Sequence, residues 1–198
     1  MLIYNPREDS YLLQKQVKKY AKDESVLDIG SGSGIQAKTA IKAKAKSVLA
    51  TDINQEAVLH LKSKGINAIK SNLFSNIKKN KKFDLIVFNP PYLPEEKRED
   101  KETYLFTTGG KRGDELIIKF LKQAKSHLNK NGIILIVLSS LTPKNKILSL
   151  MEKQDMNYKV LSSQSFFFET LEVWEIQNSK QIKTHLIKQN HGKCKART

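Results

Sequence analysis

The stretch at residues 84–92, Asp-Leu-Ile-Val-Phe-Asn-Pro-Pro-Tyr, is an apolar run that ends abruptly in a polar residue and two prolines. The run has no polar alternation, which predicts a strand buried on both faces of a sheet. Neither proline can donate a ladder hydrogen bond, so the strand must end before Pro90. Asn89 is therefore expected at the carboxyl end of a central strand, where open α/β sheets bind their ligands.

The end of this stretch offers groups that suit a planar NH2 group. Asn89 contributes a side-chain amide and is restricted to an extended backbone by the proline that follows it. Pro90 contributes a backbone carbonyl, Pro91 stiffens the loop, and Tyr92 contributes an aromatic face. Two acceptors in the plane of an NH2 group and a ring against its flat side would hold that group in place. We therefore expect these four residues to be the catalytic set.

Hydrophobic runs and helical patterns alternate along the chain, which predicts a doubly wound, Rossmann-like α/β fold with seven strands. The last two strands have no helix between them and should pair antiparallel, as a C-terminal hairpin on a mostly parallel sheet. The three phenylalanines at 166–168 are assigned to the core of the last strand, and Asp9 or Ser10 to the N-cap of the first helix. The predicted strands are 25–29, 47–52, 66–71, 84–88, 133–138, 158–161 and 166–176, and the main helices follow Ser10, Gly34, Asn54, Asp114 (to Asn129) and Thr142.

A second motif, Asp28-x-Gly30-x-Gly32-x-Gly34, joins the first predicted strand to a helix. Its glycines permit a tight turn and let a ligand lie against bare backbone. Asp52 ends the next strand, 18 positions after Gly34, and suits a carboxylate that accepts from ribose hydroxyls. An ordinary glycine-rich turn and a dinucleotide site are alternatives. The spacing is not that of a dinucleotide motif, however, and a carboxylate before the turn favours a cationic ligand. S-adenosylmethionine, with its sulfonium and ammonium groups, is the expected cofactor.

The composition indicates one domain with a strongly basic surface. The 198 residues include 35 basic and 20 acidic side chains, a net charge of +15. This favours an acidic partner, such as RNA or a ribonucleoprotein, although lysines that scatter along the chain also fit solvated faces. Lysines concentrate at 78–82 and in the tail, and residues 179–198 are expected to form a flexible basic extension.

Cysteine and histidine usage points to an intracellular protein without a metal centre. Cys194 is the single cysteine, so no disulfide framework is expected, and a cytoplasmic location is predicted. The four histidines show no metal-ligand spacing with it. No run has the length of a transmembrane helix, and we expect no signal peptide, because the chain opens directly with sequence typical of a folded domain.

With these motifs the chain resembles the class I methyltransferases, and among them the HemK-type glutamine methyltransferases that modify peptide release factors. The tetrapeptide at 89–92 is also found in adenine N6-methyltransferases. The residues at 4–10 and the glycine-rich segment at 109–113 narrow the choice between the two families. The bacterial members have a separate helical domain ahead of this region. This sequence has none ahead of Tyr4, and in this it resembles the compact archaeal and eukaryotic branch. The resemblance covers most of the chain and rests on Tyr4-x-Pro6-x-Glu8-Asp9-Ser10, Val26 to Gly34, Asn72-Leu73, Asn89-Pro90-Pro91-Tyr92 and Gly109-Gly110-Lys111-Arg112-Gly113.

The resemblance implies a role for several further residues. It implies that residues 1–178 form the methyltransferase domain. Ser10 would contact the methionine part of the cofactor, and Asp28 with Gly30 would lie beside it in the glycine-rich turn. Asp52 would hold the ribose. Asn72, where the family often has aspartate, and Leu73 would flank the adenine.

The resemblance also implies a partner and a substrate. A small zinc-binding activator would extend the sheet at the edge strand 66–71, with Ile66, Ile69, Leu73 and Ile77 as its apolar contacts. The expected reaction is N5-methylation of the glutamine in the Gly-Gly-Gln loop of a release factor, in translation termination. Two alternatives stay open: adenine N6-methylation of DNA or RNA, which requires base flipping, and a cofactor-binding, RNA-associated subunit without activity. The long polar loop at 94–113 is expected to be functional or disordered.

Overall fold

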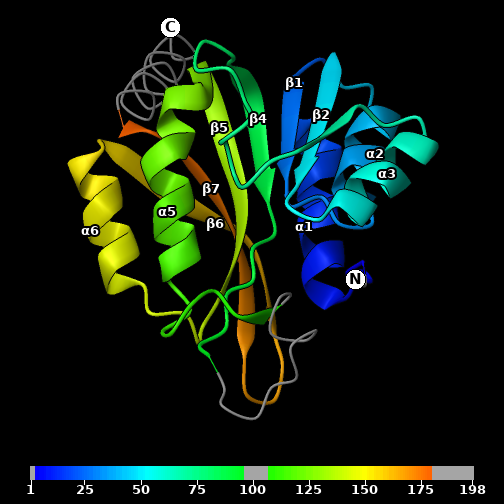
Figure 1. Ribbon diagram of the computed structural model, residues 1–198. Helices are drawn as coiled ribbons and strands as arrows, with labels where there is room; N and C mark the ends of the chain where they lie inside the picture. The colour runs from blue at the N-terminus through cyan, green and yellow to red at the C-terminus, as the bar shows by residue number, and fades with distance from the viewer. Residues whose placement is uncertain (1–2, 96–106, 180–198) are drawn as a thin grey trace, which may run out of the picture.

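The structure is a computed structural model that describes residues 3–95 and 107–179. One seven-stranded sheet has the order β3-β2-β1-β4-β5-β7-β6, with β7 antiparallel to both of its neighbours and the other pairs parallel. The predicted doubly wound, Rossmann-like fold with a C-terminal antiparallel hairpin is confirmed (Figure 1). In chain order the elements are α1 Glu8–Tyr20, β1 Ser25–Ile29, α2 Ile35–Lys42, β2 Ser47–Asp52, α3 Gln55–Ser63, β3 Ala68–Lys70, β4 Phe83–Phe88, α5 Glu115–Ala124, η1 Lys125–His127, β5 Leu128–Ser139, α6 Asn145–Lys153, β6 Met156–Ser165 and β7 Thr170–Asn178.

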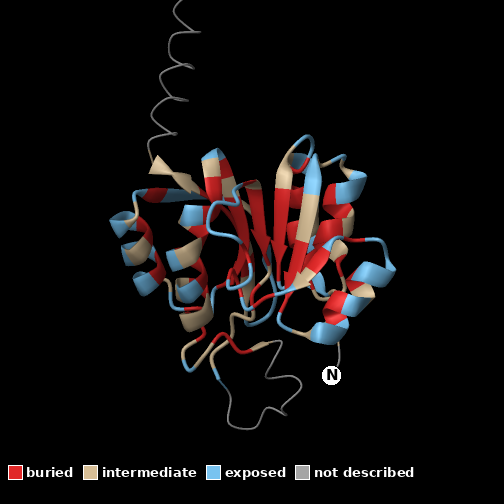
Figure 2. Cartoon of the chain, turned by 45° about the horizontal axis from the view of Figure 1, so that its top comes forward, coloured by how far each residue is buried: buried red, intermediate tan, exposed pale blue. Residues whose placement is uncertain are grey.

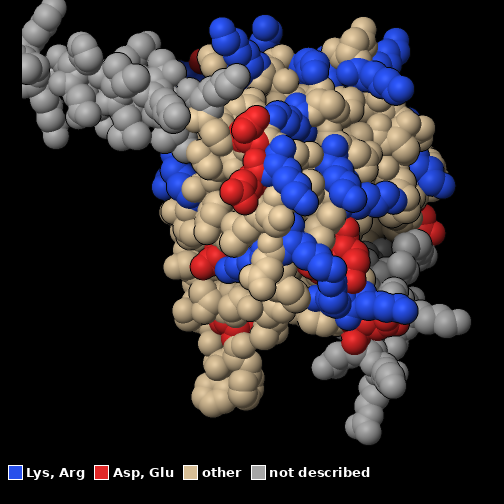
Figure 3. All heavy atoms as spheres, turned by 90° about the vertical axis from the view of Figure 1, so that its left-hand side faces the viewer, with Lys and Arg blue, Asp and Glu red and all other residues tan. Residues whose placement is uncertain are grey.

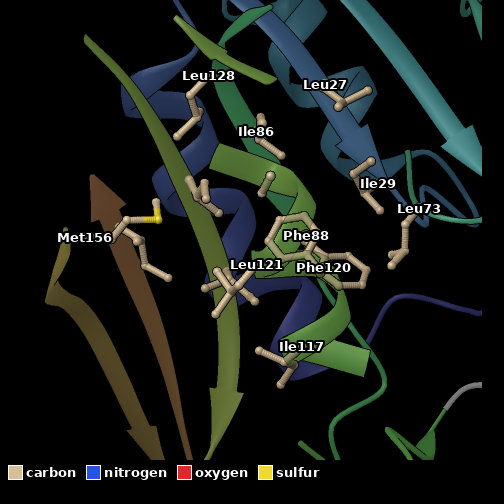
Figure 4. Close-up of a cluster of buried hydrophobic side chains, with 14 of the residues drawn as sticks. Leu27, Ile29, Leu73, Ile86, Phe88, Ile117, Phe120, Leu121, Leu128 and Met156 are labelled. Carbon is tan, nitrogen blue, oxygen red and sulfur yellow. The ribbon is translucent and has the colours of Figure 1, made fainter. Parts of the chain in front are cut away.

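Strand β4 is the buried centre of the sheet, as its apolar run predicts. Leu85 and Val87 pack with α1 on one face, and Ile86 and Phe88 pack with α5 on the other. Figure 4 shows Ile86 and Phe88 lying against residues of α5, including Phe120. All of these side chains are buried, as are most residues of the central strands in Figure 2. Burial on both faces fixes the position of the strand end, where Asn89 follows.

The helix predicted at 114–129 is shorter than its sequence pattern suggests. α5 ends at Ala124, one 3-10 turn follows, and β5 already begins at Leu128. Gly132, which lies between the helix predicted to Asn129 and the strand predicted from 133, is inside β5, where an added Cβ would sit 2.8 Å from the Phe83 carbonyl oxygen. The pairing of β4 with β5 shifts register between Phe83 and Leu85. The glycine therefore permits two strands to approach closely where their pairing is irregular. The helical pattern that precedes it in the sequence gives no sign of this role.

Three other local predictions are wrong in detail. α1 begins at Glu8 with Arg7 as its N-cap, so Asp9 and Ser10 lie inside the first turn. β3 has three residues, Ala68–Lys70, rather than six. The phenylalanines at 166–168 lie in the turn between β6 and β7, with exposed fractions of 39%, 92% and 82%. A run of aromatic residues favours a strand by propensity alone, but here the hairpin reverses at that point.

Parts of the sequence predictions fall on residues that the structure does not describe. These parts are most of the loop at 94–113 and the basic tail from residue 180. Within 3–95 and 107–179, no helix combines the length and the apolar character needed to cross a membrane.

Asp28 fastens the end of β1 to the start of α2. Its carboxylate is 1% exposed and accepts a hydrogen bond from the Ala37 backbone N–H at 3.0 Å. Burial raises the pKa of this carboxyl group to about 7, although the bond from Ala37 opposes the shift. The pKa is therefore higher in the folded protein than in the unfolded chain. The stabilising effect of the protonated form is complete below about pH 4 and is lost as the pH rises through 7.

We predict that Asp28→Asn removes this part of the pH dependence of stability. The amide oxygen can still accept from Ala37, but the side chain no longer titrates. On going from pH 8 to pH 5, the wild-type free energy of unfolding should gain about 2–3 kcal/mol more than that of the variant. Urea unfolding at the two pH values measures the difference. Parallel pH profiles for the two proteins would show that Asp28 has an ordinary pKa.

Candidate active site

A cavity of about 220 Å³ opens at the carboxyl ends of β1, β2 and β4. The chain runs from β1 outward to β2 on one side, and β4 lies on the other side of β1, so the strand order reverses here. This is the position at which open α/β sheets bind ligands. A larger hollow of about 640 Å³ lies between α6 and the start of β6, but it is open to solvent and lies at the other end of the sheet. The smaller cavity is lined in part by Tyr4, Asp9, Gly30, Gly32, Asp52, Asn72, Leu73, Asn89, Pro90 and Pro91.

The glycine-rich turn and Asp52 form one side of the cavity and are bonded to each other. Gly30 and Gly32 both have positive φ, a conformation that glycine adopts without strain. The Asp52 carboxylate accepts hydrogen bonds from the Gly32 and Asn54 backbone N–H groups, both at 2.8 Å. These bonds fix the carboxylate and leave it further lone pairs for ribose hydroxyls. Asp52 therefore lies in the wall of the cavity, and its contact with the ribose of a cofactor stays a prediction.

Two residues of the motif lie outside the cavity wall. The Asp28 carboxylate is directed at the start of α2, behind the turn. Gly34 faces α3, where an added Cβ would lie 2.5 Å from a Leu61 methyl group. Both residues shape the turn from behind. A sequence motif cannot separate the residues that contact a ligand from those that hold the contacting residues in place.

The far end of the cavity is apolar and includes Leu73 and Phe88. Leu73 has a positive φ of 52°, which is uncommon for leucine. Ser71 stabilises this turn, because its hydroxyl donates to the Leu73 carbonyl at 2.8 Å. Together with Asn72 the turn gives a flat apolar wall beside a polar residue, which suits an adenine ring. Carboxylate, bare glycine backbone and apolar wall together fit S-adenosylmethionine.

Asn89 is held in one orientation by α1. Its Nδ2 donates to Asp9 Oδ2 at 3.0 Å and to Ser10 Oγ at 3.3 Å. A carboxylate can only accept, so the NH2 end of the amide must face Asp9 and the oxygen must face away. Asn89 Oδ1 is buried and has no hydrogen-bond partner among the described residues. An unpaired buried acceptor costs roughly 1–3 kcal/mol, which a substrate N–H would recover.

Asp9 is a site residue that our sequence analysis missed. The Tyr4 hydroxyl donates to both Asp9 carboxylate oxygens at 3.0 Å. Burial, and then the nearby Asp9 charge, raise the pKa of Tyr4, so its phenol stays protonated and can donate. The signal was present in the box at 4–10, but Asp9 there also has the sequence of a helix cap. Only the packing of α1 beside β4 shows that its carboxylate orients Asn89.

Tyr92 lies beside the cavity and not in its wall. Its ring is half-buried and packs against both core clusters, and its carbonyl accepts from the Thr142 hydroxyl at 2.9 Å. Burial raises the pKa of Tyr92, and the carboxylates of Asp9 and Glu169 raise it further. The phenol is therefore neutral. Stacking of this ring on a substrate amide stays a prediction.

The glycine segment 109–113 clasps the loop that follows Asn89. The Gly109 N–H donates to the Leu93 carbonyl at 2.9 Å, and the Leu93 N–H donates to Thr107 at 2.8 Å. An added Cβ on Gly109 would lie 2.8 Å from the Pro91 carbonyl oxygen, and one on Gly113 would lie 2.6 Å from that of Tyr92. Side chains at these positions would push the loop at 89–93 away. The two sequence motifs are thus one packed unit.

Most of the residues expected at the cofactor and acceptor sites line a single cavity, as methyl transfer would require. The chain is a class I methyltransferase. The family model described as methyltransferase small domain matches residues 8–168, and the chain belongs to this family. A protein of Methanocaldococcus jannaschii, whose name proposes it as a protein N5-glutamine methyltransferase, is 34% identical over 179 residues, which are 86% of this chain and 89% of that protein. The release factor glutamine methyltransferase of Fusobacterium nucleatum is 33% identical over 79% of this chain and 49% of its own length.

Solved structures share the fold. The Mtq2–Trm112 complex of E. cuniculi, described as responsible for methylation of the translation termination factor eRF1, matches with a TM-score of 0.73 at 24% identity, over 90% of this chain and 100% of that chain. The T. thermophilus 16S rRNA methyltransferase RsmC, solved with AdoMet and guanosine, matches with a TM-score of 0.64 at 18% identity, over 88% of this chain and 44% of that chain. The chain therefore covers a whole Mtq2 chain but about half of the F. nucleatum and T. thermophilus proteins.

We predict that Gly109→Ala lowers methyl transfer at least tenfold while cofactor affinity changes little. The added methyl group would displace the loop at 89–93, and the glycine-rich turn lies elsewhere in the cavity. Steady-state kinetics and calorimetry with S-adenosylmethionine measure the two effects. Gly65→Ala is the control, because its added Cβ meets nothing within 4 Å and any effect comes from backbone strain alone. Equal losses of methyl transfer in both variants would show that Gly109 does not hold the loop at 89–93 in place.

Proposed function

We propose that the protein uses S-adenosylmethionine to methylate N5 of a protein glutamine, in the Gly-Gly-Gln loop of a peptide chain release factor. The observation that carries this proposal is the unpaired Oδ1 of Asn89, held at the cavity by Asp9. The names of the M. jannaschii and F. nucleatum relatives support the same reaction. The cytoplasm, where translation terminates, is the proposed location.

The residues would act mainly by positioning. An amide nitrogen is a weak nucleophile, because its lone pair is delocalised into the carbonyl group. Asn89 Oδ1 and the Pro90 carbonyl would accept the two N–H bonds of the substrate amide and direct the nitrogen at the methyl group. S-adenosylmethionine would supply that methyl group from its sulfonium. Positioning of this kind lowers a barrier by about 7–11 kcal/mol in ideal cases. Tyr92 would cover the amide plane, and Pro91 would keep the loop stiff.

The remaining site residues would hold the cofactor. Asp52 would accept from the ribose hydroxyls, and Asn72 with Leu73 would flank the adenine. Gly30 and Gly32 would give the methionine part close access to the backbone, with Asp28 and Gly34 supporting the turn from behind. The Ser10 hydroxyl is buried beside Asn89, within reach of Asp9, so it would act where the methionine part meets the acceptor amide.

Adenine N6-methylation is the competing activity, because an adenine also presents a planar NH2 group. Asn89 and Pro90 could accept from either group. The relatives of this chain favour the glutamine substrate. A cofactor-binding subunit without activity fits less well, because its sequence would have no need for the orienting contact between Asp9 and Asn89.

We predict that the wild-type protein transfers labelled methyl groups to a purified release factor, and that Asn89→Ala lowers kcat at least about 100-fold, a typical loss when one transition-state hydrogen bond is removed. Binding of S-adenosylmethionine should change little. A release factor with asparagine in place of the loop glutamine is the substrate control. Transfer to DNA or RNA with none to the release factor would contradict the proposal and favour the adenine alternative.

A small activator subunit at β3 is the partner that we propose, and the resemblance implies that it binds zinc. β3 is an edge strand, and the solved Mtq2 structure is a complex with Trm112. The Asn67 carbonyl and the Ser71 N–H group form hydrogen bonds with β2. Because the backbone groups of successive residues in a strand face opposite sides, those of Ala68 and Lys70 face outward. Asn76 Nδ2 already donates to the Lys70 carbonyl at 2.8 Å, so a partner would have to add to this bond or replace it.

The apolar contacts expected for this partner need correction. Ile66, Leu73 and Ile77 are 3%, 6% and 7% exposed and belong to the core of this chain. Ile69 is only partly buried. The partner would therefore bind mainly through the outward backbone groups of β3, with Ile69 as the side chain that remains available.

We predict that Lys70→Pro prevents complex formation with such an activator. Proline removes the outward N–H of Lys70 and leaves the ladder to β2 intact. Lys70→Ala is the matched control, because it changes the same side chain and keeps the N–H. Co-expression followed by size-exclusion chromatography measures both. A complex that survives Lys70→Pro would exclude strand addition at this edge.

The positive face over α5 and α6 supports a further contact with RNA or a ribonucleoprotein. Figure 3 shows many lysine and arginine side chains over this face, with several acidic ones interspersed among them. Lys119 and Lys122 of α5 and Lys146 and Lys153 of α6 are all exposed. An acidic partner such as ribosomal RNA would be attracted to this face, and binding would weaken with salt.

A further inference from the structure

The turn between β6 and β7 carries an exposed aromatic tip, which we define as Phe166, Phe167 and Phe168. Phe167 and Phe168 are 92% and 82% exposed and pack edge to face against each other, with ring centroids 4.5 Å apart. Neighbouring exposed apolar side chains of this size usually mark a binding surface. Neither the proposed catalytic set nor the cofactor site uses them.

The pairing of the strands places the aromatic tip at the active-site end of the sheet. Ile136 of β5 is opposite both Phe88 and Trp174, so Asn89 lies level with Val173. From there β7 leads back to Phe168, about 17 Å along the strand direction at ~3.3 Å per residue, and two strand spacings of ~4.8 Å separate β4 from β7. The tip is thus on the order of 15–20 Å from Asn89. In Figure 1 the turn between β6 and β7 projects beyond the end of β5 at this end of the sheet.

Hydrogen bonds link the aromatic tip to the catalytic loop. The Phe166 N–H donates to the Glu169 carbonyl, which closes the turn. Thr170 and Ser140 exchange two bonds: the Ser140 N–H donates to the Thr170 carbonyl at 2.8 Å, and the Thr170 N–H to Ser140 Oγ at 2.9 Å. Two residues further on, the Thr142 hydroxyl bonds to the carbonyl of Tyr92. The base of the turn that carries the tip is therefore tied to the loop that follows Asn89.

The surroundings of the aromatic tip indicate the chemistry of its partner. Residues 161–170 contain no lysine or arginine, in a chain with a net charge of +15. Two lysines that contact the strand β7 are paired with its carboxylates, Lys144 with Glu172 at 2.7 Å and Lys159 with Glu175 at 3.0 Å. Nucleic-acid platforms and membrane-binding tips combine aromatic residues with free basic ones. An apolar patch on a protein is the partner that this tip matches.

The size of the tip also limits the partner. A buried phenylalanine contributes roughly 150–250 Å², so the tip buries a few hundred Å² at most. Stable interfaces bury about 1,200–2,000 Å² in total, or roughly 800 Å² on each partner. The tip alone is too small to hold two copies of this chain together. It is large enough to be one part of an interface whose other part is the active site.

We propose that the aromatic tip is a docking element for the protein substrate and contacts an apolar patch on its folded surface, 15–20 Å from the acceptor glutamine by the strand spacings above. This inference rests on the proposed function. A short peptide around the glutamine fills the site near Asn89 but does not reach the tip. The tip therefore distinguishes the folded substrate protein from a peptide with the same local sequence.

The test compares the double variant Phe167→Ser/Phe168→Ser with the wild-type protein, each with S-adenosylhomocysteine, in titrations with the folded release factor. We expect the Kd for the release factor to rise at least tenfold. The kcat/KM for a short Gly-Gly-Gln peptide and the melting temperature should be unchanged. Ile41→Ser is the matched control: Ile41 is 48% exposed on α2, and its substitution should leave the Kd unchanged.

The possible outcomes separate the two proposals. An unchanged Kd in the double variant overturns the docking inference, whether or not the peptide is methylated. The inference is also overturned if the double variant loses a dimer, or a binding to lipid vesicles, that the wild-type protein shows, while the Kd for the release factor is unchanged. That result would assign the tip to those partners. A weakened Kd supports the inference even if no glutamine is methylated, and in that case the proposed function fails alone.

Discussion

The hydrogen bond from Asn89 to Asp9 is the constraint on which the site depends. An asparagine side chain carries its donor Nδ2 and its acceptor Oδ1 on the same carbon, so the two can exchange places when the amide turns over. The loop alone would not select between these two orientations. The Asp9 carboxylate selects one, because it accepts from Nδ2 and leaves Oδ1 without a partner. This contact joins the start of α1 to the end of β4, 80 residues apart in the chain. The fold must therefore bring those two ends together for the site to exist.

The packing of the sheet supplies that placement. α1 buries Leu13 and Val17 against the face of β4 that carries Leu85 and Val87, so its first turn lies beside the strand end. The opposite face of β4 is covered by α5. After the strand, the glycine segment 109–113 holds the loop at a distance that only bare backbone allows. The buried strand, the end of α1 and the glycine segment together fix the side chain of Asn89, and this rigidity suits a reaction that depends on positioning.

Much of this arrangement could be predicted from sequence, because its signals are local. The apolar run of β4 and the glycine-rich turn can each be recognised from a few consecutive residues. The position of Asp52 in the cavity wall can be predicted from its place at a strand end. The orientation of Asn89 could not be predicted, since it depends on a contact between α1 and β4. Asp28 has the sequence position of a cofactor ligand, yet its carboxylate serves the start of α2. The start of β5 and the phenylalanines at 166–168 were misplaced because propensity does not show where a strand bulges or a hairpin turns.

The central claim is that Asn89 receives the substrate amide through Oδ1 while Asp9 holds its Nδ2. A crystal structure with S-adenosylhomocysteine and a Gly-Gly-Gln peptide tests this claim most directly. We expect the glutamine NH2 group within hydrogen-bond distance of Asn89 Oδ1 and the Pro90 carbonyl, with the bond from Nδ2 to Asp9 unchanged. A glutamine side chain that contacts neither acceptor, or an Asn89 amide turned away from Asp9, would contradict the account.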